Sequence, residues 1–275
     1  MLIAIAAIGA INTIVTNPNF QWDIVWQYFT SQNVLIGLVR TLQLTVIAMA
    51  IGIVLGVLLA VMNLSQNPLV SGAATSYVWF FRGTPLLVQI VFWYNLAALF
   101  PTVSLGIPFG PTFVSASSND LITPFLAAIL ALGLNEAAYL SEIIRGGLLA
   151  VDRGQTEAAQ ALGMSQLKVL RRIVLPQAMR VIVPPVGNET ISMLKLTSLV
   201  SVISLPELLY SVQVVYQANY QVIPLLLVAS IWYLIVTTIL SIGQRSLERY
   251  YGRGFGGNSS TTPRRKSPRK KASTA

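Results

Sequence analysis

The stretch EAAQALGMSQLKVLRRIVLP, from Glu157 to Pro176, decides the fold because it is an ordered polar segment between two long apolar runs. Residues 156–162 are good helix formers, and Gly163 is placed to end that helix as a C-terminal cap. Ser165 is a suitable N-cap for a second short helix. Pro176 fits the first turn of the following apolar helix, where its missing N–H costs little. The stretch predicts a helix, a glycine turn, a second helix and then a membrane-spanning helix.

The first of these helices is too short to be stable by itself in water, where an isolated helix needs about 12–15 residues. It must therefore pack against something. One interpretation is that it docks on another protein. The alternative is a loop that folds only onto the membrane-embedded part of its own chain.

The composition around this stretch is that of a membrane protein. The chain has 275 residues, of which 54% are hydrophobic and 10% charged, and its mean hydropathy is +0.68. A soluble chain would carry about 25% charged residues. The absence of cysteine and histidine excludes disulfides and thiolate metal sites, and removes the commonest metal ligand and general base. We predict an all-α, polytopic membrane helical bundle, with no catalytic residue and no metal site.

Several apolar runs reach the roughly 20 residues that cross a bilayer. The run at 2–16 is short and also fits a signal peptide, but Thr16-Asn17-Pro18 is a poor cleavage site and no positive region precedes the run. Residues 19–31 form an interfacial aromatic segment. The predicted spans, five in the core and six with the first, lie near 2–16, 34–62, 77–100, 121–145, 179–204 and 222–244.

The distribution of lysine and arginine predicts the topology. The loops near 17–33, 101–120 and 205–221 contain neither residue, whereas the 146–178 loop contains four. We therefore place the 146–178 loop and the carboxyl terminus in the cytoplasm, with Arg40 as the exception to the rule. Six spans put both termini inside; five leave the amino terminus outside.

Three regions follow from these patterns: an amino-terminal span with the aromatic segment (1–33), a transmembrane domain (34–245) and a tail (246–275). Nine of the 18 lysines and arginines lie from Arg245 onward. The tail lacks apolar residues to bury, so we expect it to be disordered and to contact anionic lipid. Nucleic acid is the alternative partner, which we do not favour. No GxxxxGK[ST] sequence occurs, so a different subunit would have to supply any ATP site.

The 157–176 stretch also resembles a known family. Glu-Ala-Ala, three residues, Gly, nine residues and then Ile-x-Leu-Pro is similar to the EAA loop of binding-protein-dependent ABC importer permeases. Residues 81–87, 139–147 and 195–200 resemble the polar amino acid branch, which transports glutamate, glutamine, histidine or arginine. Leu196 departs from the polar or acidic residue of many relatives. The resemblance covers about 34–245, and the matching loop positions are Glu157, Ala158, Ala159, Gly163, Ile173, Leu175 and Pro176.

The resemblance implies a type I importer transmembrane domain in a bacterial cytoplasmic (inner) membrane. It implies that the EAA helix docks on a cytoplasmic ABC ATPase dimer, which binds ATP and Mg²⁺. Its other implied partners are a second permease subunit, identical or homologous, and an extracytoplasmic amino acid binding protein. The implied substrate is glutamate, glutamine or another polar amino acid.

Ionisable groups within spans usually face a cavity or a partner. Glu142 and Arg145 lie near a membrane boundary, where anchoring explains them. Glu189 and Lys195 are six residues apart, too far for a pair on one helix. Pro184-Pro185 predicts a loosened helix before Glu189, as in transport sites.

We propose that six polar residues border a translocation path, with packing or pairing between subunits as the alternative for each. A zwitterion needs both a cationic and an anionic neighbour, and the set offers both. Its members are Asn135, Glu136, Glu189, Lys195, Thr197 and Ser198.

Three further alternatives remain open. Gly52 and Gly56 have the spacing of closely packed helices, either within one subunit or between two. A self-sufficient secondary transporter or channel would need inverted repeats with paired broken helices, which the sequence does not display. A scaffold without transport would leave the intramembrane charges unexplained.

Overall fold

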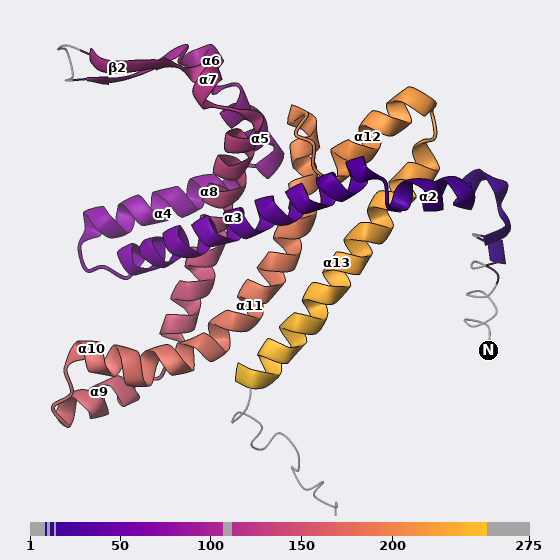
Figure 1. The fold of residues 1–275 in the computed structure, drawn as a ribbon. Helices are drawn as coiled ribbons and strands as arrows, with labels where there is room; N and C mark the ends of the chain where they lie inside the picture. The colour runs from indigo at the N-terminus through magenta and orange to yellow at the C-terminus, as the bar shows by residue number, and fades with distance from the viewer. Residues whose placement is uncertain (1–8, 10–11, 14, 107–111, 252–275) are drawn as a thin grey trace, which may run out of the picture.

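The computed structural model describes residues 9, 12–13, 15–106 and 112–251 (Figure 1). The predicted span at 2–16 lies largely outside these residues, as does the tail from 252 onward. The helices are η1 (Pro18–Phe20), α2 (Trp22–Phe29), α3 (Gln32–Asn63), α4 (Pro68–Gly83), α5 (Leu86–Tyr94), α6 (Leu96–Leu99), α7 (Ser118–Leu121), α8 (Pro124–Leu149), α9 (Arg153–Ala161), α10 (Gln166–Val169), the π-helical turn η2 (Leu170–Val174), α11 (Leu175–Leu196), the 3₁₀ helix η3 (Thr197–Ile203), α12 (Leu208–Asn219) and α13 (Val222–Tyr251).

The predicted helical membrane bundle is confirmed, although not every predicted span is a single unbroken helix. Among the described residues, α3, α8 and α13 are each long and apolar enough to cross a membrane. The bent pair formed by residues 166–203 and α12 adds a fourth span if it is counted as one. Five core spans were predicted. In addition, α13 continues to Tyr251, so residues 246–251 are helical rather than part of a disordered tail.

The predicted span at 77–100 is interrupted. It consists of the end of α4 and all of α5, separated by Thr84 and Pro85. Proline has no N–H to donate and disfavours helical geometry in the residue before it. Thr84 is accordingly extended, with φ −112° and ψ 141°. Hydropathy alone could not detect this break because the residues on both sides are apolar.

The predicted span at 179–204 is straighter than expected at its two prolines. The α11 helix runs through Pro184 and Pro185 without ending. The chain instead breaks at Ser204, which has φ 58°, and the following helix α12 is inclined by 44°. The Nε2 atom of Gln244 on α13 lies 3.4 Å from the carbonyl oxygen of Pro184 and donates to it. Packing against α13 therefore supports the part of α11 that proline was expected to loosen.

A hairpin occupies the 101–120 connection, where only a loop was predicted. Strand β1 (Thr102–Gly106) pairs antiparallel with β2 (Thr112–Ser117), and Ser104 lies opposite Ser115. Figure 1 shows the hairpin at the end of the molecule opposite α9 and α10.

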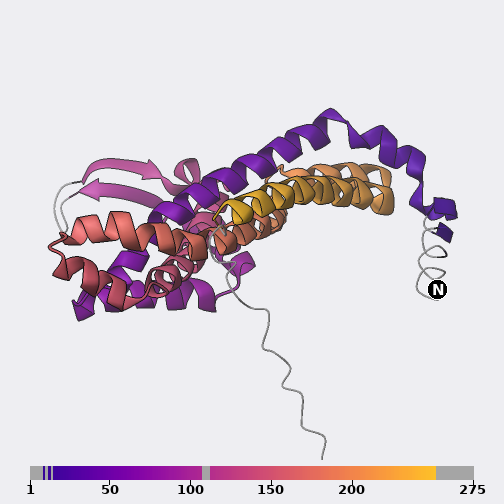
Figure 2. The same ribbon diagram turned by 90° about the horizontal axis from the view of Figure 1, so that it is seen from below.

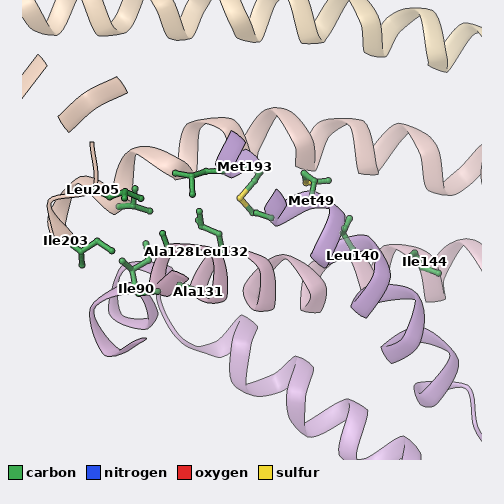
Figure 3. Packing of buried hydrophobic residues seen from close by; sticks show 14 of the residues in the cluster. Met49, Ile90, Ala128, Ala131, Leu132, Leu140, Ile144, Met193, Ile203 and Leu205 are labelled. Atoms are coloured by element: carbon green, nitrogen blue, oxygen red, sulfur yellow. The ribbon is translucent and has the colours of Figure 1, made fainter. Parts of the chain in front are cut away.

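The main core lies between α3, α8 and α11 (Figure 3). Glycines allow α3 and α8 to approach closely. A Cβ atom on Gly52 would lie 2.6 Å from Cγ of Glu136, and one on Gly56 would lie 3.0 Å from Cβ of Leu140. Both glycines thus face α8 of the same chain, as the alternative of packing within one subunit predicts.

A second core packs α2 and the start of α3 against α12 and α13. It contains Val25 of α2, Val34 of α3, Leu208 of α12 and Leu225 of α13. In both ribbon views α2 lies beside α13 (Figures 1 and 2). At this contact the ring of Trp232 stacks on Phe29 with centroids 4.7 Å apart, and its Nε1 donates to the carbonyl oxygen of Phe29 at 2.9 Å.

Glu207 lies between the two cores and is completely buried. Its carboxyl group caps α12 by accepting from the N–H groups of Leu209 and Tyr210 at 2.9 and 2.7 Å. The hydroxyl of Tyr233 on α13 donates to it at 3.0 Å, and the hydroxyl of Thr41 on α3 at 3.4 Å. One carboxyl group thus connects three helices.

Candidate translocation site and coupling loop

The polar groups of three helices meet in a cavity of about 480 Å³. Its wall includes the break between α4 and α5, the middle of α8 and the second half of α11. The lining residues are Arg82, Gly83, Thr84, Pro85, Leu86, Asn135, Glu136, Tyr139, Glu189 and Leu196. Asn135, Glu136 and Glu189 were predicted from the sequence to border a translocation path.

Glu136 is the most constrained residue of the cavity. Its side chain is 2% exposed, and Gly52 leaves the space that its Cγ occupies. Its Oε1 atom has no hydrogen-bond partner within the part of the chain that the structure describes. A buried polar atom without a partner is costly, so this oxygen is a ready acceptor for a donor that enters the cavity.

Asn135 and Gln89 compensate for the missing N–H of Pro85. In a continuous helix the carbonyl oxygen of Phe81 would accept from residue 85, which is proline. Here Asn135 Nδ2 donates to that oxygen at 2.9 Å, and Gln89 Nε2 donates to it at 3.0 Å. Gln89 Nε2 also donates to Oγ1 of Thr84 at 2.7 Å. The break in the span is therefore held in a defined shape next to Glu136.

Arg82 supplies a positive charge to the cavity and was not among the predicted path residues. Its guanidinium carbon lies 5.0 Å from the centre of the Tyr139 ring, in a cation–π contact. The sequence did contain a signal for it, because Arg82 is the only charged residue between 77 and 100. Gln89 and Tyr139 had no comparable signal, since polar and aromatic residues are common in spans.

The other predicted path residues lie outside the cavity. Lys195 is exposed. Thr197 is buried, and its hydroxyl donates to the carbonyl oxygen of Leu194 at 2.8 Å. The hydroxyl of Ser198 donates to the carbonyl oxygen of Lys195 at 2.7 Å. Both hydroxyls thus bond to backbone carbonyl oxygens where α11 passes into η3. Leu196, the departure from the family pattern, lines the cavity instead.

Glu142 and Arg145 form an ion pair on α8, with 2.7 Å between Oε2 of Glu142 and NH2 of Arg145. This arrangement agrees with the predicted anchoring near a membrane boundary.

The coupling loop (residues 152–176) has the predicted sequence of elements. Asp152 caps α9 by accepting from the N–H of Gly154 at 2.7 Å. Gly163 follows α9 with φ +80°, and its N–H donates to the carbonyl oxygen of Gln160 at 2.9 Å. Ser165 then occupies the N-cap position of α10, and Pro176 lies in the first turn of α11.

The coupling loop is only partly covered by its own chain. Ala159 and Val169 are buried, and Gln155 accepts from Gln177 Nε2 at 2.5 Å. By contrast, Leu162 is 84% exposed and Leu167 is 61% exposed. One side of the loop therefore folds onto the membrane domain, while an apolar side remains available to a partner.

The coupling loop connects to the cavity through helical structure. Helix α10 passes into the η2 turn and then into α11 without a non-helical residue. Glu189 lies 14 residues beyond Leu175, which corresponds to about 21 Å of helix. Helical structure is therefore continuous from α10 in the loop to Glu189 in the cavity wall.

Comparisons with known proteins agree with this geometry. Residues 52–252 match the family model described as binding-protein-dependent transport system inner membrane component. The chain is 44% identical to the arginine transport system permease protein ArgU of Corynebacterium glutamicum, over 92% of this chain and 78% of ArgU. It is 33% identical to the glutamine transport system permease protein GlnP of Escherichia coli K12, over 84% of this chain and 97% of GlnP.

Solved structures show the same fold. The chain is similar to a crystal structure of an amino acid ABC transporter with histidines, with a TM-score of 0.68 and 34% identity over 84% of this chain and 98% of that one. It also resembles the inward-facing MetNI methionine ABC transporter, with a TM-score of 0.61 and 19% identity over 81% of this chain and 99% of that one.

Proposed function

The chain belongs to the family of binding-protein-dependent transport system inner membrane components, and from that premise we propose that it is the permease subunit of an ATP-driven importer of polar amino acids. The observation that carries the proposal is the coupling loop, whose exposed apolar side continues through α11 to a charged cavity. The proposed cycle alternates the access of this cavity between the two sides of a bacterial inner membrane.

The energy source in this proposal is a separate ABC ATPase dimer that binds ATP and Mg²⁺. Its groove would receive α9 and cover Leu162 and Leu167. A second permease subunit, identical or homologous, would complete the path, and an extracytoplasmic binding protein would deliver the substrate. The charge distribution supports a cytoplasmic position for the coupling loop and the carboxyl terminus in this proposal.

The cavity favours a substrate that carries a positive side chain. It holds two carboxyl groups, from Glu136 and Glu189, and one guanidinium, from Arg82. Arg82 can attract the carboxylate that every free amino acid has, which leaves two acidic groups for its amino group and its side chain. The arginine name of the ArgU relative supports the same choice. Glutamate, one of the substrates that the resemblance implies, has no comparable support, because its second carboxylate would meet Glu136 and Glu189.

Uptake into proteoliposomes tests both parts of this function. The permease is reconstituted with its ATPase and binding protein, and labelled arginine, glutamine and glutamate are compared. We expect uptake that needs ATP and the binding protein, and that is greatest for arginine. Undiminished uptake without the ATPase would support a secondary transporter or channel instead.

The substrate class is tested separately with Glu136→Gln, which keeps the shape of the side chain and removes its charge. We expect arginine uptake to fall at least tenfold and glutamine uptake to fall less. An equal fall for both substrates would contradict the cationic preference but not the importer function.

A further inference from the structure

The β1–β2 hairpin is an element that the transport cycle described above does not use. It projects from the bundle beyond α5 and α6, at the end of the molecule far from α9 and α10 (Figure 1). The 101–118 segment contains no charged residue, and the 101–120 connection contains no lysine or arginine. By the positive-inside rule it faces the side opposite the coupling loop.

One face of the hairpin carries a row of hydroxyl groups. Thr102 lies opposite Ser117 and Ser104 opposite Ser115. Because side chains alternate along a strand, these four residues share a face. Phe113 lies two positions before Ser115 and is 70% exposed. An exposed aromatic ring beside small hydroxyl groups is typical of protein recognition surfaces, where aromatic residues often dominate the binding energy.

The base of the hairpin is closed by Ser118, which is completely buried. Its N–H donates to the carbonyl oxygen of Pro101 at 3.0 Å, and its hydroxyl donates to the carbonyl oxygen of Phe100. The carbonyl oxygen of Ser118 accepts from the N–H of Ile122 at 2.8 Å. These contacts close the two ends of the hairpin onto each other at the point where the chain returns to the bundle.

The closed base leads directly to the translocation site. A hollow of about 450 Å³ lies beside it, lined by Tyr94, Asn95, Ala97, Ala98, Ile122 and Pro124. Tyr94 ends α5, and the other end of α5 begins at the Thr84–Pro85 break in the wall of the charged cavity. A partner seated on the hairpin and in the hollow would therefore contact one end of α5, and the opposite end of the same helix borders the charged cavity.

We propose that the hairpin and the hollow at its base form a docking surface for the extracytoplasmic binding protein. The inference rests on the proposed function, which requires such a partner on this side of the membrane. A membrane surface is a poorer match, because anionic lipid attracts lysine and arginine and the hairpin contains neither. Since the hairpin carries no charge, its contacts depend on shape and apolar burial.

Cross-linking locates the partner on the hairpin. The chain contains no cysteine, so single cysteines can be introduced and labelled with a benzophenone. The probes are Ser104→Cys and Ser115→Cys on the hydroxyl face. Tyr220→Cys, which is 88% exposed in the connection between α12 and α13, is the matched control. The assembled transporter is illuminated in nanodiscs together with the purified binding protein that stimulates its ATP hydrolysis.

We expect adducts with the binding protein from positions 104 and 115, and at least tenfold less from 220. Adducts mainly with lipid or with a second permease copy would overturn the inference, and so would equal labelling from all three positions.

The functional test measures the binding-protein concentration that half-saturates ATP hydrolysis. We compare the wild type, Phe113→Ser and a variant in which residues 102–117 are replaced by a short Gly-Ser linker. We expect the half-saturating concentration to rise at least threefold for Phe113→Ser and tenfold for the linker variant, with unchanged hydrolysis in the absence of binding protein. A stimulated wild type with unchanged variants would overturn the docking role alone. A wild type that no binding protein stimulates would overturn the proposed function and this inference together.

Discussion

At the scale of single residues, the position of Glu136 depends on the missing side chain of Gly52. At Gly52, α3 lies close against α8 at the point where the carboxyl group of Glu136 enters the cavity. The same two helices could pack with larger residues only by moving apart, which would carry the carboxyl group with them. Small residues along α3 therefore define the geometry of a site to which α3 contributes no side chain.

Gly52→Ala tests this dependence. The new Cβ atom would lie 2.6 Å from Cγ of Glu136, and overpacking of this kind costs about 1–3 kcal/mol. We expect a lower unfolding temperature in detergent and at least a fivefold loss of uptake. Gly72→Ala is the matched control, because a Cβ atom there meets nothing within 4 Å. Similar behaviour of the two variants would show that Gly52 does not position Glu136.

At the scale of elements, the coupling loop combines a short helix with a left-handed turn. The φ of +80° at Gly163 is disfavoured for every residue with a Cβ atom, although nothing surrounds that position. The turn joins α9 to α10, and Leu162 beside it is 84% exposed. The orientation of the apolar side thus depends on a single backbone angle.

Gly163→Pro should uncouple the transporter without preventing its insertion into the membrane. Proline cannot adopt a positive φ and cannot donate to the carbonyl oxygen of Gln160. We expect at least a tenfold fall in ATP-dependent uptake and less ATPase retained on the purified permease. Gly146→Ala on the neighbouring helix α8, where a Cβ atom also meets nothing within 4 Å, should behave as wild type. Normal retention and uptake by Gly163→Pro would exclude a docking role for the turn.

The sequence predicted the elements whose signals are local. Gly163, Ser165 and Pro176 mark helix ends by their own conformational preferences, and the structure confirms all three. Part of the cavity was predicted, because a carboxyl group within an apolar run stands out in the sequence whichever way its side chain faces. Lys195 lies outside the cavity: its charge is visible in the sequence, but the face of α11 on which it lies depends on packing. The hairpin and the bend at Ser204 gave no hydropathy signal.

At the scale of the whole molecule, Glu207 lies at the boundary between the two cores. Leu205 belongs to the core of α3, α8 and α11, whereas Leu208 belongs to the core of α2, α12 and α13. The chain crosses from one core to the other within four residues, and the Glu207 carboxyl group bonds to α3 and α13 at that point. The two cores are therefore joined by hydrogen bonds as well as by the continuous helix α3.

Glu207→Leu should loosen this junction. The N–H groups of Leu209 and Tyr210 and the hydroxyls of Thr41 and Tyr233 would lose their acceptor. A buried donor left unpaired costs about 1–3 kcal/mol. We expect the unfolding temperature in detergent to fall strongly for Glu207→Leu and less for Tyr233→Phe, which removes one donor only. Equal stability of Glu207→Leu and the wild type would mean that the hydrogen bonds do not hold the cores together.

The contact between Phe29 and Trp232 has a consequence for biosynthesis. These residues are separated by 203 positions, yet their rings stack and Trp232 donates to the backbone of residue 29. A ribosome releases α2 before α13, so the second core stays open until α13 has been made. During that interval Glu207 is already made while its partner Tyr233 on α13 is not. A chain that ends before residue 222 would therefore keep an open second core, and the Glu207 carboxyl group would lack one of its donors.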